Sequence, residues 1–434
     1  MIRLSRRRFL TLSGGLVIAG CTNRSELSTG STPTTGATTT QPVPPSTTAP
    51  TSTIPPSTVV TTIATDSGVL PGDPILVMVE LAGGNDALNT MPPLDDPYQA
   101  LRPTLALTDD EMITATALDG YALHGSLAPI VPLIDAGRVA MIAGIGFGDP
   151  DRSHFVSTDR WLRADRMDES LGWLGRWLDG LPDDLPSLGA TALGSNGRIL
   201  LGADRRGTVI NTAESFAFPD DLDRQALTAL TQPASADPLE AAAQRAFATT
   251  IDAVDEFGVI ADAVRADGPT DDYVDIGQTA FRTGLAVAAE LVTSGVGARV
   301  ITVKGGGFDT HSGQKGVHAA LLDDLALGLA EFWAKIDAAG VSDRVLVATH
   351  SEFGRRVAEN GSDGCDHGAA GLSMLMGDHV VGGVHGALTT ADLLQGDLRP
   401  VIDPRTMFTT CLDWLGADAE PILGQRYDEV TLLA

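Results

Sequence analysis

Four nearly continuous apolar runs, separated by helical stretches, constrain the fold of this 434-residue chain more than any other feature. The apolar runs occupy residues 74–81, 139–145, 298–303 and 344–349. Helical patterns precede the last three runs, at residues 127–136, 278–293 and 317–339. Runs without polar alternation are typical of parallel strands buried on both faces. The alternation therefore predicts an α/β fold, with a doubly wound, mainly parallel sheet in an α/β/α sandwich.

The segment from about residue 173 to residue 275 follows this alternation less closely. Its first half is rich in loop-forming residues, and helical runs lie near residues 239–247 and 249–266. We expect this segment to form an irregular helical cap or insertion on the α/β core. The sequence offers no disulfide framework, and whether Cys365 and Cys411 pair stays open.

The N-terminal residues have the order of an export signal. Residues 5–10 place three arginines before an apolar stretch at residues 12–19, and Gly20 and Cys21 follow at once. We expect residues 1–21 to be a twin-arginine lipoprotein signal, with Cys21 as the lipidation site that anchors the chain to the membrane. An ordinary cleaved signal with an incidental cysteine is the alternative. A permanent membrane-spanning helix is disfavoured, because it needs roughly 20 apolar residues.

Composition changes sharply behind this signal. Residues 22–72 are rich in Ser, Thr and Pro, and such a segment has too little apolar surface to offset its ordering entropy. We expect a disordered tether there, followed by one α/β domain at residues 73–434. The formal charge of −27 argues against nucleic acid as a partner, and it means that a phosphate or sulfate site needs local cations.

Polar residues gather where the predicted strands end. They form clusters at residues 83–90, 148–155, 304–311, 350–355 and 363–368. In an open parallel sheet, ligands bind beyond the carboxyl ends of the strands, so these clusters are expected to meet. Five of the eight histidines lie in or near them, with His318 counted, together with carboxylates, which predicts a site for divalent metal ions.

Each cluster also has a structural interpretation when it is taken alone. The 309–311 segment can be a turn closed by an Asx hydrogen bond, and the glycines at 305–307 can mean only a tight backbone path. Ser153 can be a plain helix N-cap, and Asp86 can cap a turn. Joint placement after successive strands favours the shared site.

The motifs in these clusters resemble those of an uncharacterised, twin-arginine-exported family of the alkaline phosphatase and sulfatase superfamily. The resemblance covers about residues 73–415. It rests on LAGGNDALN at 81–89, RSHF at 152–155, GFDTH at 307–311, SEFGR at 351–355 and DHG at 366–368. The superfamily implies a hydrolase that uses two metal ions and a Ser or Thr nucleophile at a helix start.

This resemblance implies a role for individual residues. The implied metal ligands are Asp86, Asp309, His311, His350, Glu352, Asp366 and His367. Ser153 is the implied nucleophile, and Arg152 or Arg355 is expected to hold the ester oxygens. The chain departs from the superfamily at two points, because its Asp-x-His replaces Asp-x-x-x-His and its Ser351-Glu352 replaces Asp-His. The resemblance therefore implies divalent ions (Zn²⁺, Mn²⁺, Ca²⁺ or Mg²⁺) without fixing their number or identity.

Three functions follow from this interpretation. The first is a metal-dependent hydrolase of phosphate or sulfate esters, which acts on an anionic small molecule or polymer at the outer face of the cytoplasmic membrane. The second is a catalytically inactive, surface-tethered binding or scaffold protein on the same fold. The third is a phosphomutase or transferase that uses the same ligands.

Overall fold

The computed structural model describes residues 74–182, 185–211, 216–218, 222–231, 235–267 and 281–434. All of them belong to one compact unit, Val69–Ala434. The predicted signal at residues 1–21, its lipidation residue Cys21 and the predicted tether at residues 22–72 lie outside the described residues. In the described part of the chain, no helix combines the length and the hydropathy that crossing a membrane requires.

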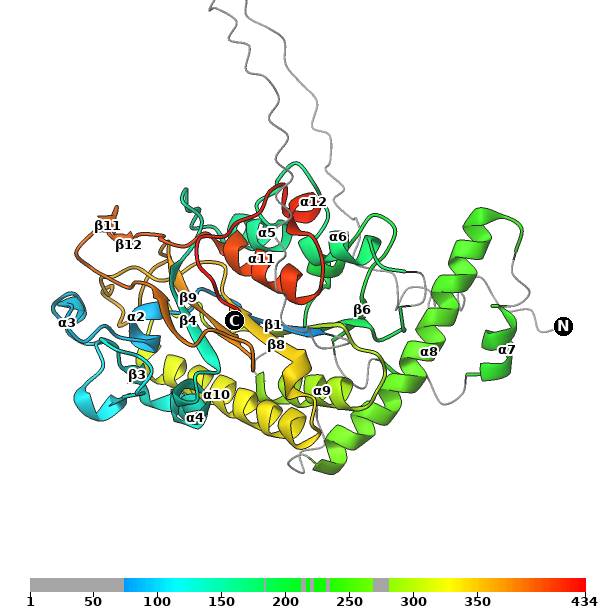
Figure 1. The fold of residues 1–434 in the computed structure, drawn as a ribbon, viewed down its shortest axis with the longest axis horizontal. Helices are drawn as coiled ribbons and strands as arrows, with labels where there is room; N and C mark the ends of the chain where they lie inside the picture. The colour runs from blue at the N-terminus through cyan, green and yellow to red at the C-terminus, as the bar shows by residue number, and fades with distance from the viewer. Residues whose placement is uncertain (1–73, 183–184, 212–215, 219–221, 232–234, 268–280) are drawn as a thin grey trace, which may run out of the picture. The chain divides into compact units, whose positions relative to one another are not determined.

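An eight-stranded sheet forms the centre of this unit (Figure 1). The strands are β1 (Ile75–Leu81), β4 (Val139–Ile145), β5 (Ala190–Leu193), β6 (Thr208–Ile210), β7 (Val300–Gly305), β8 (Val345–His350), β9 (Gly371–Met376) and β10 (Gly383–Gly386). Their order is β10-β4-β9-β8-β1-β7-β5-β6. Neighbouring strands are parallel except where β9 pairs with β4 and β8. The predicted fold class, a mainly parallel α/β sheet, is confirmed.

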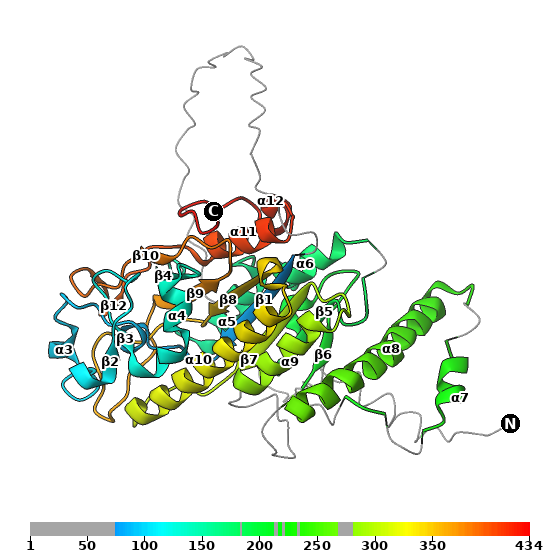
Figure 2. The same ribbon diagram turned by 60° about the horizontal axis from the view of Figure 1, so that its bottom comes forward.

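Helices cover both faces of the sheet (Figures 1 and 2). One layer holds α4 (Val131–Asp135), α9 (Phe281–Thr293) and α10 (Gln314–Ala338). The other holds α5 (His154–Arg163), α6 (Trp173–Asp179), α11 (Pro404–Trp414) and α12 (Ala419–Leu423). Shorter elements are α2 (Ala87–Thr90), α3 (Tyr98–Leu101), α7 (Arg224–Ala229), β2 (Met112–Ile113), β3 (Leu123–His124), β11 (Leu393–Leu394) and β12 (Asp397–Leu398).

Strand β1 shows why both layers form. Side chains alternate between the two faces of a strand, so an uninterrupted apolar run needs cover on both sides. Ile75, Val77 and Val79 belong to the core beneath α9 and α10. Leu76 and Met78 belong to the second core, beneath α5, α6 and α11. Full burial of each such side chain stabilises the folded state by about 1.5–3 kcal/mol relative to leaving it exposed.

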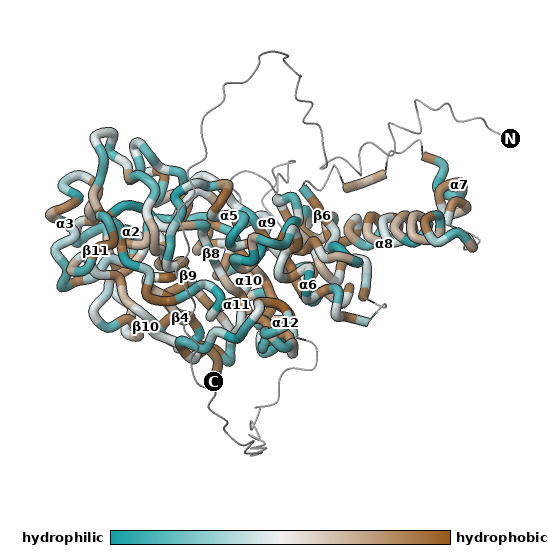
Figure 3. The backbone as a smooth tube through the Cα atoms, turned by 90° about the horizontal axis from the view of Figure 1, so that it is seen from above, coloured by the Kyte–Doolittle hydropathy of each residue, from teal (hydrophilic) through white to brown (hydrophobic). Residues whose placement is uncertain are grey.

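The segment predicted as a cap or insertion also supplies strands to the main sheet. Strands β5 and β6 extend the sheet beyond β7, which the sequence analysis did not predict. The two predicted helical runs form one helix, α8 (Pro238–Asp267), along which apolar and polar residues are interspersed (Figure 3). Its buried residues, Ala253, Phe257, Ile260, Ala261 and Val264, follow the spacing of one helix face. They therefore form the single apolar face that an amphipathic helix buries.

The sheet brings the loops of interest to one edge. Strands β1, β7 and β8 are mutually parallel, and β4 runs in the same direction because both β4 and β8 are antiparallel to β9. The carboxyl ends of all four strands therefore face the same side. The polar segments that follow them come together there, as predicted.

Candidate metal centre

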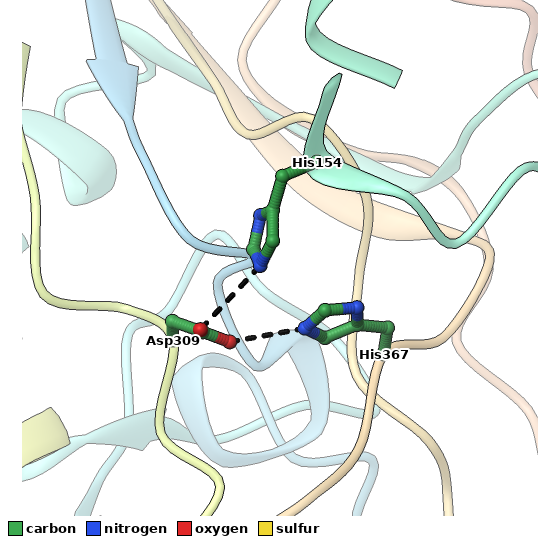
Figure 4. Close-up of side chains that lie close together, drawn as sticks. All are labelled: His154, Asp309 and His367. Carbon is green, nitrogen blue, oxygen red and sulfur yellow. Dashed lines mark hydrogen bonds and ion pairs between the residues drawn. The ribbon is translucent and has the colours of Figure 1, made fainter. Parts of the chain in front are cut away.

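Three side chains from three different loops meet at this carboxyl edge (Figure 4). His154 is the first residue of α5, which follows β4, and Asp309 lies in the loop after β7. His367 lies in the long return from β8 to β9. Each residue offers one ligand atom, and the three atoms lie within 4.8 Å of one another. We call these residues, with the adjoining His311, the histidine cluster.

The Asp309 carboxylate lies at the centre of the histidine cluster. Its Oδ1 atom is 3.0 Å from Nε2 of His367 and 3.0 Å from Nε2 of His311. Its Oδ2 atom is 3.4 Å from Nε2 of His154. The Nε2 atoms of His311 and His367 are themselves only 2.9 Å apart. One nitrogen of each ring is therefore directed at the same carboxylate.

The other ring nitrogen of each histidine contacts an oxygen atom. These contacts join Nδ1 of His154 to Oε1 of Glu352 (2.8 Å), Nδ1 of His367 to the carbonyl oxygen of Arg152 (2.7 Å) and Nδ1 of His311 to Oδ1 of Asp366 (3.1 Å). A carbonyl or carboxylate oxygen accepts hydrogen bonds, so we infer that each Nδ1 carries the proton. Each neutral ring then has a lone pair on Nε2.

This arrangement fits a bound metal ion. With the Nδ1 tautomer, three imidazole lone pairs and a carboxylate face one another, and imidazole with carboxylate is a donor set for transition metals. Ligand atoms around a tetrahedral Zn²⁺, at bond lengths of about 2.0 Å, lie roughly 3.3 Å apart. Four of the separations, the three from Asp309 and that between His311 and His367, are 2.9–3.4 Å and close to that value, and the ligand atoms of His154 and His367 lie within 4.8 Å of each other. Oxygen partners at Nδ1 are typical of metal-ligating histidines.

The electrostatics of the cluster favour a positive ion. Burial opposes ionisation of Asp309, but the hydrogen bond from Arg355 and the contact with His367 outweigh it and lower the pKa of Asp309 to about 2. Burial likewise opposes ionisation of Glu352, yet its hydrogen bond with His154 holds the pKa of Glu352 below the usual range. The same hydrogen bond raises the pKa of His154. Both carboxylates are therefore ionised at neutral pH.

Arg355 fixes the loops beneath the cluster. Its guanidinium is buried and donates hydrogen bonds to Oδ1 of Asp309 (2.7 Å) and to the carbonyl oxygens of Gly83, Gly84 (2.8 Å), Phe308 (2.9 Å) and Cys365 (2.9 Å). These contacts connect the loops after β1, β7 and β8. Arg355 thus orients the carboxylate of Asp309, and its predicted contact with ester oxygens stays a prediction.

Gly83 allows two of these loops to approach closely. Its φ of +121° is unfavourable for other residues, and a Cβ atom there would lie 2.4 Å from the backbone nitrogen of Asp309. The Gly83 N–H also donates to both carboxylate oxygens of Glu352, each at 3.0 Å. The glycine after β1 therefore positions both Asp309 and the carboxylate that contacts His154.

Two predicted metal ligands lie apart from the cluster. Asp86 is buried and bound by Nη1 of Arg102 at 2.6 Å, and this charge outweighs burial and lowers the pKa of Asp86. His350 is buried against Trp161, with ring centroids 5.1 Å apart, and burial lowers the pKa of His350. No contact among the described residues joins Asp86 or His350 to the histidine cluster. Their roles as ligands stay predictions.

Ser153 and Arg152 border the cluster. Ser153 is the N-cap residue of α5, and its N–H donates to Oδ1 of Asp151 at 2.6 Å, while its hydroxyl makes no capping bond. Arg152 presents its carbonyl oxygen to His367 and its guanidinium to Asp397. The two residues therefore flank the N-terminus of α5, beside His154.

His154 is the cluster residue to which the sequence analysis gave no role. It lies in the RSHF motif, where chemistry was assigned to the neighbouring residues Arg152 and Ser153. The available signal was its position at a helix start after a buried strand, which is the same signal that selected Ser153. Glu352 and Asp366, predicted as ligands, contact the outer nitrogens of His154 and His311.

Glu352→Gln is expected to weaken metal binding by roughly 10- to 100-fold, as loss of an outer partner of a ligating histidine typically does. The amide removes the charge that holds the proton on Nδ1 of His154. Competition with a fluorescent chelator measures the affinity. Glu359→Gln is the control, since this carboxylate accepts backbone N–H groups of Thr104 and Leu105. Equal affinities for the two variants would refute the role of Glu352.

A family model described as a protein of unknown function, DUF1501, matches residues 149–429. The match spans α5 to the C-terminal helices and includes the three residues of Figure 4. Among curated proteins, none matches the sequence.

Three solved structures align with much of the chain at low identity. The sulfatase PsFucS1 from Pseudoalteromonas sp. is 11% identical with a TM-score of 0.38, and the alignment covers 83% of this chain and 72% of that one. The phosphonate monoester hydrolase SpPMH from Silicibacter pomeroyi is 8% identical with a TM-score of 0.35 (83% and 78% covered). The lipoteichoic acid synthase LtaP from Listeria monocytogenes is 8% identical with a TM-score of 0.33 (80% and 72% covered). These scores are too low to support an activity.

Proposed function

The chain belongs to the DUF1501 family, and we propose that it is a metal-dependent hydrolase of phosphate or sulfate esters. One observation carries the proposal: the Nε2 atoms of His154, His311 and His367 converge on Asp309 while their Nδ1 atoms contact oxygens. With the Nδ1 atoms protonated, the three Nε2 atoms have lone pairs to offer a metal ion beside the carboxylate.

The ligand atoms of the cluster restrict the identity of the metal ion. Three imidazoles with one carboxylate favour Zn²⁺ or Mn²⁺ over the oxygen-seeking ions Ca²⁺ and Mg²⁺. Such an ion supplies positive charge that polarises an anionic ester. The side chains of Asp309 and His311 are 46% and 43% exposed, so the cluster has a side that is open to a substrate.

Ser153 is the proposed nucleophile. Its Oγ atom would form a bond to phosphorus or sulfur as the ester oxygen leaves with the bonding electrons and takes up the proton that Oγ gives up. Water would then cleave the seryl ester and regenerate Ser153, and the N-terminus of α5 favours the negative charge that develops. The structural support is its position at the N-cap, next to His154, with a hydroxyl that makes no capping bond.

Ser153→Ala is expected to lower kcat/KM by on the order of 1,000-fold or more while leaving metal content unchanged, because only the nucleophile is lost. The assay uses p-nitrophenyl phosphate, bis(p-nitrophenyl) phosphate and p-nitrophenyl sulfate. Ser157→Ala is the control, since this helix serine donates to the carbonyl oxygen of Asp151. Full activity of the Ser153 variant would reject it as nucleophile.

The alternative function, a catalytically inactive scaffold protein, predicts that no ester is hydrolysed. Metal-loaded wild-type protein would then hydrolyse none of the three esters and still bind an anionic polymer.

We further propose that the chain is exported by the twin-arginine route and lipid-anchored through Cys21, which the mass of the mature N-terminus tests. Twin-arginine export carries folded proteins, so it is compatible with a metal centre loaded before export.

A further inference from the structure

Two arginines share one buried carboxylate next to the histidine cluster. Asp397 in β12 is fully buried, and its Oδ2 atom accepts hydrogen bonds from Nε (2.8 Å) and Nη2 of Arg152. Its Oδ1 atom has no hydrogen-bond partner among the described residues and lies 3.7 Å from Nε of Arg356. We call Arg152, Arg356 and Asp397 the arginine pair.

Backbone contacts attach the arginine pair to the cluster. The carbonyl oxygen of Arg152 accepts the hydrogen bond from Nδ1 of His367 at 2.7 Å. The N–H of Arg356 donates to the carbonyl oxygen of Asp366 at 2.9 Å. Arg355 is buried beneath the cluster, whereas the side chain of the next residue, Arg356, is 41% exposed. The two successive arginines thus lie in different environments.

The arginine pair carries a local positive charge in an acidic chain. Two guanidinium groups and the Asp397 carboxylate together carry one positive charge, against −27 for the whole chain, and the carboxylate of Asp366 lies near enough for Arg356 to lower its pKa. Nη1 of Arg152 and both terminal nitrogens of Arg356 make no hydrogen bond with the described residues. Guanidinium groups with free donors bind anionic oxygens well, and the bonds to Asp397 already orient Arg152.

We propose that the arginine pair binds a second anionic group of the substrate, so that the preferred substrates are esters with an additional phosphate, sulfate or carboxylate beside the one hydrolysed. The inference rests on the proposed function, because the histidine cluster takes the first anionic group. A polymer with repeated phosphate or sulfate esters has this chemistry. Without such local cations, the net negative charge of the chain would repel this anionic polymer.

The test uses phenylphosphonate and its 3- and 4-carboxyl derivatives, which are not esters and are not hydrolysed. Their affinities for Mn²⁺-loaded protein are measured by calorimetry at neutral pH. Wild-type protein is expected to bind one carboxyl derivative at least about tenfold more tightly than phenylphosphonate, as a charge-assisted hydrogen bond allows. Arg356→Ala is expected to abolish this preference and to leave the phenylphosphonate affinity unchanged.

Arg399→Ala is the matched control. Arg399 has a similarly exposed side chain, is paired with Asp392 and follows the same β12 strand, so its loss removes an equal charge elsewhere. The control is expected to keep the preference. Loss of the preference in this variant as well would overturn the proposal.

The outcomes separate the subsite from the hydrolase. A preference that survives in Arg356→Ala, or that wild-type protein lacks, overturns the subsite alone. A preference that disappears in Arg356→Ala, in a protein that hydrolyses no ester, keeps the subsite and rejects the hydrolase. Failure of all three phosphonates to bind counts against both the subsite and the hydrolase.

Discussion

Asp309→Ala is expected to remove the bound metal ion and, with it, ester hydrolysis. Asp309 is the residue on which the three Nε2 atoms converge, and its carboxylate is ionised far below neutral pH. Its loss removes one ligand of the four and the only negative charge among them, both of which strengthen the binding of a divalent ion. The affinity loss is expected to exceed the roughly 10- to 100-fold that follows from loss of an outer partner.

Metal content and kcat/KM are measured on the same preparation of the Asp309 variant. Asp392→Ala is the control, because this exposed acidic residue is paired with Arg399 away from the cluster. Arg355 loses one partner but keeps its bonds to four carbonyl oxygens, so the fold is expected to persist. A variant that keeps both metal and activity would show that the convergence on Asp309 serves another purpose.

Arg102→Met is expected to destabilise the protein by about 3–5 kcal/mol, the usual cost of leaving a buried charge without its partner. Arg102 is fully buried and binds Asp86, Asn89 and the carbonyl oxygens of Arg356 and Val357. The variant removes all four contacts and leaves the buried Asp86 carboxylate without a countercharge, with Gln314 as its remaining side-chain hydrogen-bond donor. Denaturant unfolding of metal-loaded protein measures the loss.

A second substitution makes this prediction specific. Arg102→Met combined with Asp86→Leu removes both charges and is expected to recover part of the lost free energy of unfolding. Arg399→Ala breaks an exposed ion pair and is expected to cost less than about 1 kcal/mol. A loss for Arg102→Met as small as that for Arg399→Ala would contradict a structural role for the ion pair.

The variant Asp86→Asn distinguishes a structural role of Asp86 from a role as metal ligand. If Asp86 serves only the buried ion pair, Asp86→Asn lowers stability and leaves metal content unchanged. If it also ligates a metal ion, as the sequence motif predicts, the variant loses metal as well. The two measurements on one variant distinguish these roles.

The long strands could be predicted because both of their faces are buried. An uninterrupted apolar run such as β1 or β8 has one stable environment, the middle of a layered sheet. Strands β5 and β6 have four and three residues, too few to show such a pattern. Their place in the sheet comes from the parallel pairing of β5 with β7 and of β6 with β5, contacts that local sequence does not encode.

The loops of the site could be predicted, but not the direction of each side chain. The strand ends placed Asp309, His311, Glu352, Asp366 and His367 near one another. Whether a residue in these loops faces solvent or the interior depends on how the loops pack. Arg355 and Arg356 are adjacent, yet one is buried under the cluster and the other is half-exposed. Tertiary contacts alone determine this difference, as they do for His154.

The central claim is that the histidine cluster holds a divalent metal ion, and metal analysis tests it most directly. Full-length protein, purified without chelators, is analysed by mass spectrometry for bound metals, and its Tm is recorded before and after EDTA. We predict close to stoichiometric Zn²⁺ or Mn²⁺, and a Tm that falls with EDTA and recovers when the metal is returned. Metal-free protein that takes up neither ion, with a Tm that EDTA does not change, would contradict the claim.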